Sequence, residues 1–331
     1  MNQRGTLLLT RDDVIQLLNL DECIAAVENA FKLHGAAQLA PPGILSVHAS
    51  DGGFHIKAAL LPLARSYFAA KINGNFFHNA QRFNLPNIQG LIVLCDATHG
   101  YPLSVIDSIE ITILRTGAAT AVAAKHLARP DSRVATICGC GNQGRIQLRA
   151  LTRVLRLERV FALDVDRERS RQFAEQQSKE LGVGITPTFD LTDAVSRSDV
   201  CITCTPARES FLKREQLPRG LFIAAVGADS PDKQELEPEI LGSSKVVTDI
   251  LDQCAEIGEL NHALRRGVVR RQDVYAELGE IVAGQKRGRT SSDEIIVFDS
   301  TGTALQDVAA ASIVYEKALR MGRGTAIDFA A

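Results

Sequence analysis

The sequence lacks several features that would mark a protein for a particular setting. Its 331 residues carry 37 basic and 39 acidic side chains, and a net charge of −2 favours neither a nucleic-acid-binding nor a bilayer-binding surface. No apolar run approaches the length of a membrane span, and the first residues lack the apolar core of a signal peptide. With 45% hydrophobic and 23% charged residues, the composition is that of a globular protein. This length predicts two domains, or one large one.

Disulfide and metal patterns are missing as well. The seven cysteines are odd in number and have no framework spacing, which predicts a reducing, cytoplasmic setting. Cys201 and Cys204 match CxxC, but they lie in an apolar run typical of a buried strand, so we interpret them as packing residues. The seven histidines show no metal-ligand spacing, and we predict no metal site.

A strand, a glycine-rich turn and a helix follow one another around residues 134–155. The β-branched run that begins at Val134 leads into Gly139-Cys-Gly141-Asn-Gln-Gly144, and apolar residues then recur at helical spacing. This order is the dinucleotide-binding fingerprint. Gly139 allows a tight turn, Gly141 lets the backbone approach a pyrophosphate, and Gly144 lets helix and strand pack closely. Asn142 and Gln143 complete the predicted loop, where the N–H groups of the helix face the phosphates.

An acidic residue follows the next predicted strand. The run Val160–Leu163 ends in Asp164, at the position where a carboxylate holds the ribose hydroxyls of a dinucleotide. A carboxylate there repels a 2′-phosphate, so we expect NAD rather than NADP, although Arg167 and Arg169 are close in the sequence.

The order of elements changes along the chain. Helical patterns at 12–18 and 21–34 precede several extended segments, which together predict an α+β domain with an antiparallel sheet. A long alanine-rich helix, 107–127, is closed by Pro130. From residue 133 strands and helices alternate, which is typical of a parallel Rossmann sheet. We therefore predict an α/β protein with a Rossmann domain at 131–303, and a final helix that returns to the first domain.

Several further stretches resemble the ornithine cyclodeaminase/μ-crystallin family, which includes archaeal-type alanine dehydrogenases and cyclic-imine reductases. Besides the glycine loop, the matching stretches are Ala70-Lys-Ile-Asn73, Leu85-Pro-Asn-Ile-Gln-Gly90, Thr112-Ile-Leu-Arg-Thr-Gly-Ala118, Thr203-Cys-Thr-Pro206, Ala225-Val-Gly-Ala-Asp-Ser-Pro-Asp-Lys-Gln-Glu-Leu236, Glu277-Leu-Gly-Glu-Ile-Val-Ala-Gly284 and Phe298-Asp-Ser-Thr-Gly302. The second half is most similar to the alanine dehydrogenase branch. The resemblance implies a homodimer in which residues 1–130 with 304–331 form a substrate-binding and dimerisation domain.

The resemblance also implies roles for individual residues. Lys71 and Arg115 would bind the substrate carboxylate, and Asp229 would exchange the amine proton while hydride moves between nicotinamide and Cα. Alternatives remain for each: a surface position for Lys71, an internal salt bridge for Arg115, and a turn for Asp229, with Asp232 a weaker rival. Further positions would face the cofactor, namely Asn87, Arg115, Thr116, Thr205, Val226, Gly227, Lys233 and Ser300, and Thr301 would face the substrate.

Two departures from the cyclodeaminase pattern bear on the substrate. Gly43 stands where cyclodeaminases have an arginine that binds carboxylate; Lys57, which shares a strand face with His55, is a candidate replacement or a solvated residue. No acid precedes Pro62, which argues against ornithine. The sequence thus predicts an NAD-dependent oxidoreductase acting on a small amino or imino acid. A cyclodeaminase-type lyase that uses NAD catalytically, and a non-catalytic NAD(P)H-binding protein, are the alternatives.

Overall fold

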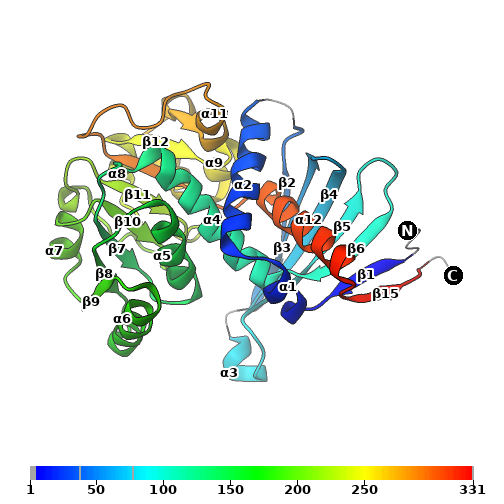
Figure 1. Cartoon of the computed structure of the whole chain (residues 1–331). Helices are drawn as coiled ribbons and strands as arrows, with labels where there is room; N and C mark the ends of the chain where they lie inside the picture. The colour runs from blue at the N-terminus through cyan, green and yellow to red at the C-terminus, as the bar shows by residue number, and fades with distance from the viewer. Residues whose placement is uncertain (1–4, 37–38, 77, 330–331) are drawn as a thin grey trace. The chain divides into compact units, whose positions relative to one another are not determined.

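The chain forms two compact units. The computed structural model describes residues 5–36, 39–76 and 78–329. Unit 1 comprises residues 1–115 and 303–331, and unit 2 comprises residues 116–302 (Figure 1). The domain boundary predicted after Pro130 differs from this division, which falls inside a helix, between Arg115 and Thr116. Pro130 marks the end of that helix, whereas the division into units depends on which residues each part of the helix contacts.

Unit 1 is built on a seven-stranded sheet with the order β15-β1-β6-β5-β4-β3-β2. Its neighbouring strands are antiparallel, as predicted, except that β1 is parallel to β6. The strands are β1 (Thr6–Leu9), β2 (Gly43–Ala49), β3 (Gly52–Pro62), β4 (Ser66–Asn75), β5 (Ile88–Asp96), β6 (Pro102–Asp107) and β15 (Thr325–Ile327).

The helices of unit 1 come from both ends of the chain. They are α1 (Arg11–Leu17), α2 (Leu20–Gly35), α3 (Asn79–Phe83), the start of α4 (Ile109–Leu127) and α12 (Ala304–Met321). Thr10 and Asp13 form a reciprocal cap at the start of α1. The largely buried helix α12 packs against α2, β3 and β4, so residues from the end of the chain reach the first sheet (Figure 1).

Unit 2 is an eight-stranded sheet with the order β13-β12-β14-β11-β10-β7-β8-β9, and all of its paired strands are parallel. The strands are β7 (Val134–Cys138), β8 (Arg159–Leu163), β9 (Gly184–Thr188), β10 (Val200–Thr203), β11 (Phe222–Ala225), β12 (Lys245–Thr248), β13 (Ala276–Glu277) and β14 (Ile296–Asp299). The connecting helices are α5 (Asn142–Val154), α6 (Arg167–Leu181), α7 (Leu191–Ser196), α8 (Pro238–Gly242), α9 (Leu251–Ile257), α10 (Glu259–Arg265) and α11 (Leu278–Val282).

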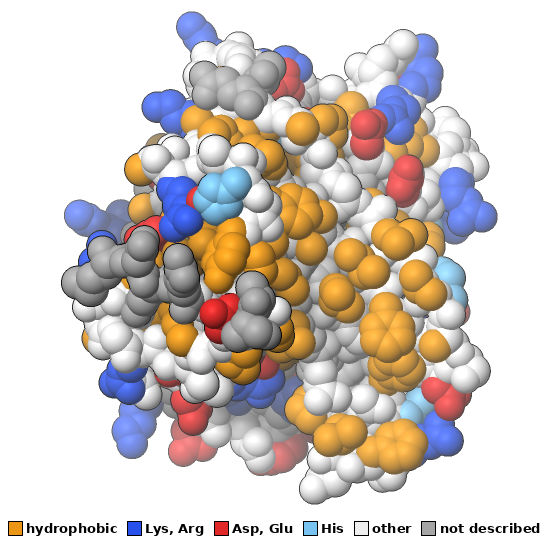
Figure 2. Space-filling view, turned by 90° about the vertical axis from the view of Figure 1, so that its right-hand side faces the viewer, with side chains coloured by type: hydrophobic (Ala, Val, Ile, Leu, Met, Phe, Trp, Pro, Cys, Tyr) orange, Lys and Arg blue, Asp and Glu red, His pale blue; other side chains and the backbone are white. Residues whose placement is uncertain are grey.

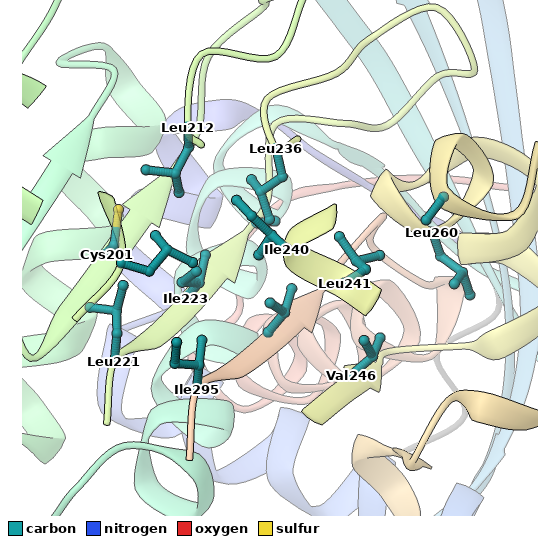
Figure 3. Close-up of a cluster of buried hydrophobic side chains, with 14 of the residues drawn as sticks. Cys201, Leu212, Leu221, Ile223, Leu236, Ile240, Leu241, Val246, Leu260 and Ile295 are labelled. Carbon is teal, nitrogen blue, oxygen red and sulfur yellow. The ribbon is translucent and has the colours of Figure 1, made fainter. Parts of the chain in front are cut away.

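The strand order reverses beside β7. The chain places β8 and β9 on one side of β7 and then returns to place β10 on its other side. In such open parallel sheets, ligands bind at the carboxyl ends of the strands next to this reversal. A cluster of buried aliphatic side chains, including Ile223, Leu236 and Leu260, packs beside β10 and β11 (Figure 3). It gives the loops at the carboxyl ends of these strands a rigid support.

Candidate active site

Three cationic side chains are buried together in unit 1. Lys71 lies in the middle of β4, and Lys57 is its direct cross-strand partner on β3. Arg115 lies on α4, and all three residues are at most 7% exposed. Two lysines facing each other across a sheet repel, so their burial requires a nearby anion.

Asp307, in the first turn of α12, provides that anion. Its carboxylate lies 2.8 Å from Lys71 Nζ and 3.0 Å from Arg115 Nε. Arg115 also donates to Gln306 Oε1 at 2.8 Å, and Lys71 Nζ lies 3.4 Å from Thr112 Oγ1. The internal salt bridge considered as an alternative for Arg115 is therefore present.

Burial and neighbouring charges shift two pKa values in this cluster. Burial, followed by the charge of Arg115, lowers the pKa of Lys71 from 10.5 to about 7, although Asp307 opposes the shift. Burial works against ionisation of Asp307, but Lys71 and Arg115 together hold the pKa of its carboxyl below the usual value. One carboxylate thus faces three cationic groups, an arrangement that suits an anionic ligand.

Asp307 is not among the site residues predicted from the sequence. An acidic residue near the start of a helix is expected from the helix dipole alone, and the alanine-rich surroundings gave no sign of a partner. The available signal was that a helix buried on nearly all sides carries a charged residue at a buried position.

The glycine loop of unit 2 has the shape that a dinucleotide needs. Gly139 has φ +104°, which favours glycine, and a Cβ on Gly144 would lie 2.1 Å from Gly139 O. A Cβ on Gly141 would meet no protein atom within 4 Å, so its backbone is open to a ligand. Gly141 caps α5 without a side-chain hydrogen bond, and Asn142 and Gln143 form the first turn of that helix. These features fit a pyrophosphate at the helix N-terminus.

Asp164 follows β8 and is held in place by the glycine loop. Its Oδ2 accepts from Cys140 N at 2.9 Å, and its Oδ1 accepts from Asp166 N at 2.9 Å. Arg169 Nη1 lies 3.5 Å from Oδ1, a long contact from a side chain that is 54% exposed. A fixed carboxylate beside the fingerprint fits ribose hydroxyls better than a 2′-phosphate.

Asp229 lies in the loop after β11. Its Oδ1 is 2.6 Å from Lys233 Nζ, so the predicted acid/base residue and a predicted cofactor residue form an ion pair. The rival carboxylate, Asp232, pairs instead with Arg208 at 3.2 Å and is 55% exposed. The less exposed Asp229 next to a cation is the better candidate for proton transfer.

The remaining residues predicted to face the cofactor or the substrate are found in both units. Thr205, Val226 and Gly227 follow β10 and β11, and Thr116 is partly buried on α4. Ser300 and Thr301 are buried after β14, and both hydroxyls lie within hydrogen-bond distance of Asp249. In unit 1, the Asn87 side chain accepts from Ala80 N in α3.

The cysteine pair in and after β10 shows no reactive arrangement. Cys201 is buried in the strand, and Cys204, just beyond it, donates to Cys138 O at 3.3 Å. Both are free thiols. Burial raises the pKa of Cys204 well above its usual value, so the thiol stays protonated, as expected of a packing residue.

Neither a metal centre nor a membrane helix emerges from the part of the chain that the structure describes. Within it, no three His, Cys, Asp or Glu side chains are grouped to hold a metal ion. No helix among these residues is both long and apolar enough to cross a membrane.

Comparison with known proteins identifies the family. The model of the ornithine cyclodeaminase/mu-crystallin family matches residues 4–322. The chain belongs to this family. It is 40% identical to alanine dehydrogenase of Archaeoglobus fulgidus over 326 residues, which is 98% of each chain. The predicted family is thereby confirmed.

Solved structures of family members share the fold of this chain. An archaeal alanine dehydrogenase dimer with bound NAD superimposes with a TM-score of 0.94 at 40% identity, covering 98% of this chain and 99% of that one. The Δ1-pyrroline-2-carboxylate reductase of Thermococcus litoralis, in complex with NADH and L-proline, gives a TM-score of 0.89 at 34% identity, covering 97% and 100%. The predicted α/β fold class is confirmed as well.

Proposed function

We propose that this family member is an NAD(H)-dependent oxidoreductase that exchanges hydride with the Cα of a small amino or imino acid. The observation that carries the proposal is the 40% identity to an alanine dehydrogenase over 98% of both chains. The glycine loop supports it, because Gly141 leaves its backbone open where a dinucleotide needs close approach. The reaction is that of an alanine dehydrogenase or a cyclic-imine reductase.

The cofactor is held by the fingerprint and the residues around it. The N–H groups that begin α5 bind the pyrophosphate, and Asp164 binds the adenosine ribose and selects NAD over NADP. When bound, the nicotinamide supplies the hydride acceptor or donor.

The protein's own side chains bind the substrate and move its proton. Lys71 and Arg115 bind the substrate carboxylate, and the partial charge balance provided by Asp307 keeps both cations in place before substrate arrives. Lys57, buried opposite Lys71, adds positive charge in the absence of an arginine at Gly43. Asp229 accepts the amine proton during oxidation and returns it during reduction.

The working form is a homodimer joined through the outer face of the unit 1 sheet. The register of β2 to β5 places one set of exposed apolar side chains on the same face, namely Leu45, Val47, Phe54, Leu60, Phe68, Ile72 and Leu91. Hydrophobic side chains gather widely on the side of unit 1 seen in Figure 2. A broad apolar surface of this kind is typical of a protein–protein interface, and the alanine dehydrogenase relative is a dimer.

Absorbance of NADH, followed with purified protein, tests the reaction. L-alanine with NAD, pyruvate with ammonia and NADH, and pyrroline-2-carboxylate with NADH should each be assayed, with NADPH in parallel. We expect net NADH change with at least one of these substrates. Proline formed from ornithine without net NADH change would instead indicate the lyase, and binding of NADH without any turnover would indicate a non-catalytic protein.

Asp229→Asn tests the assignment of the acid/base residue. The amide has nearly the same size but cannot take up the amine proton, so we expect turnover to fall by roughly 10²-fold or more. Affinity for NADH, measured by fluorescence, should stay close to that of the wild type. Asp232→Asn, in the same loop, is the matched control and should retain most of the activity. Equal rates in wild type and Asp229→Asn would overturn the assignment.

A further inference from the structure

Three buried carboxylates form a connected series along the carboxyl ends of the unit 2 strands. Glu235, Glu259 and Asp299 are each at most 1% exposed. Burial raises the pKa of each, that of Asp299 to about 7. Buried carboxylates are costly unless hydrogen bonds compensate them, so each of these groups needs hydrogen-bond donors around it.

The three groups bind backbone N–H groups in sequence. Asp299, at the end of β14, accepts from the N–H of Glu259 at 3.2 Å and from that of Leu260 at 2.9 Å. Glu259 in turn accepts from the N–H of Glu235 at 2.7 Å and from that of Leu236 at 3.1 Å. Leu236 and Leu260 both belong to the aliphatic cluster of Figure 3, which anchors this backbone in the core. The backbone at Glu235 is therefore held both by its hydrogen bond to Glu259 and by the packing of the neighbouring Leu236 in the core.

Glu235 joins the loops that follow β10 and β11. Its Oε1 accepts from Thr205 N at 2.6 Å and from Thr205 Oγ1 at 2.7 Å, and its Oε2 accepts from Gly227 N at 3.0 Å. All three partners are donors, which suits an ionised carboxylate. The contact leaves no spare room, since a Cβ on Gly227 would lie 2.4 Å from Oε2. One side chain thus holds the ends of two adjacent strands together.

The sheet order indicates which half of a dinucleotide these loops serve. The fingerprint follows β7, and Asp164 follows β8 on one side of it, whereas β10 and β11 lie on the other side. A dinucleotide lies across the point where the strand order reverses. If Asp164 binds the adenosine ribose, the loops after β10 and β11 serve the nicotinamide half.

We propose that Glu235 is a positioning residue for the nicotinamide half of the cofactor site, which rests on the function proposed above. By holding Thr205 and Gly227 at a set separation, it shapes the surface against which that half binds. Its loss should therefore weaken binding of the complete dinucleotide while leaving the adenosine and pyrophosphate contacts intact. A residue that only stabilised the fold would not distinguish between the two halves.

Binding of NADH and of ADP-ribose, which lacks nicotinamide, to the full-length protein tests the proposal by calorimetry. Glu235→Gln retains the size but loses the charge and one acceptor, so we expect the Kd for NADH to rise roughly ten-fold, the effect of one charge-assisted hydrogen bond. The Kd for ADP-ribose should change by less than about two-fold. Equal losses for both ligands, or no loss for NADH, would overturn the proposal.

Asp199→Asn is the matched control. Asp199 also accepts from two backbone N–H groups, those of Arg133 at 2.7 Å and Val134 at 3.0 Å, but at the amino end of β7. We expect this variant to lose stability without a change in either Kd; a selective loss of NADH binding here would contradict the assignment to Glu235. If Glu235→Gln does not fold, Glu235→Asp decides, because it keeps the charge but is too short to reach both loops. Wild-type protein that binds ADP-ribose but not NADH would refute the proposed function itself, before any variant is compared.

Discussion

Lys71 is the residue whose chemistry depends most on its surroundings. Because burial and Arg115 lower its pKa to about 7, the protonation of Lys71 depends on pH in the neutral range when no ligand is bound. The folded pKa lies below that of the unfolded chain, so burying the charged form costs stability below about pH 7, and this cost diminishes as the pH rises towards 10.5. A bound carboxylate acts in the opposite direction and favours the protonated lysine.

This charge state predicts a pH-dependent affinity for anions. We expect the Kd of a substrate-like carboxylate such as pyruvate, measured by calorimetry with NADH bound and ammonia absent, to rise above pH 7 by up to about ten-fold per pH unit. Lys71→Met should bind the anion weakly and without this slope. Lys245→Met, which removes a lysine paired with Glu294 in unit 2, should keep the slope of the wild type. A flat profile in the wild type would contradict a titrating Lys71.

The position of Asp307 between two buried cations predicts that a substitution of nearly equal size will strongly lower stability. Asp307→Asn leaves Lys71 and Arg115 buried without their shared anion, and breaking a buried pair costs roughly 3–5 kcal/mol. Urea unfolding should show this loss. Asp51→Asn, which breaks a surface pair with Arg82 at 2.7 Å, should cost less than about 1 kcal/mol. Similar losses in the two variants would show that Asp307 is not the counter-ion of the cluster.

At the scale of elements, the glycines in the strand–turn–helix unit from β7 to α5 have two different roles. One is needed for packing within the protein, and another for binding the cofactor. Gly144 is needed for packing, because its Cβ position overlaps Gly139 O, whereas the Cβ position of Gly141 is open. The same glycine pattern therefore combines two different physical requirements, and substitutions can distinguish them.

Alanine at each position provides the test. Gly144→Ala should lower the free energy of unfolding by about 1–3 kcal/mol and weaken NADH binding as well, because the loop must move. Gly141→Ala should leave thermal stability nearly unchanged but weaken NADH binding, because the methyl group occupies the pyrophosphate position. Unchanged NADH affinity in Gly141→Ala would contradict the assigned binding site.

At the scale of the whole molecule, the exposed apolar face of unit 1 predicts the assembly. Ile72 and Leu91 are direct partners on β4 and β5, and both are more than 40% exposed in the single chain. Ile72→Asp should place a charge in the proposed interface and shift the dimer to monomer, as measured by sedimentation velocity. Ile15→Asp, at an exposed position on α1, is the control and should remain dimeric. A wild-type monomer, or a dimer unaffected by Ile72→Asp, would refute this interface.

Local patterns in the sequence were sufficient to identify most elements. Most strands of both sheets and the alternation from β7 onwards follow from short-range periodicity and turn residues, and the dinucleotide loop follows from glycine spacing. Short helices such as α3 and α8, and the short strands β13 and β15, were missed because few residues carry their signal. The cytoplasmic setting and the roles of the site residues remain predictions.

The sequence by itself determined the family, the fold class and the position of the dinucleotide fingerprint, because these depend on residues close together in the chain. Tertiary structure alone decided what the buried charges meet. Lys71 and Asp307 are 236 positions apart, and Glu235 reaches back 30 positions to Thr205, so no local pattern could pair them. Whether a buried ionisable group is costly, neutral or useful depends on its partners, and those partners are brought together only when the chain folds.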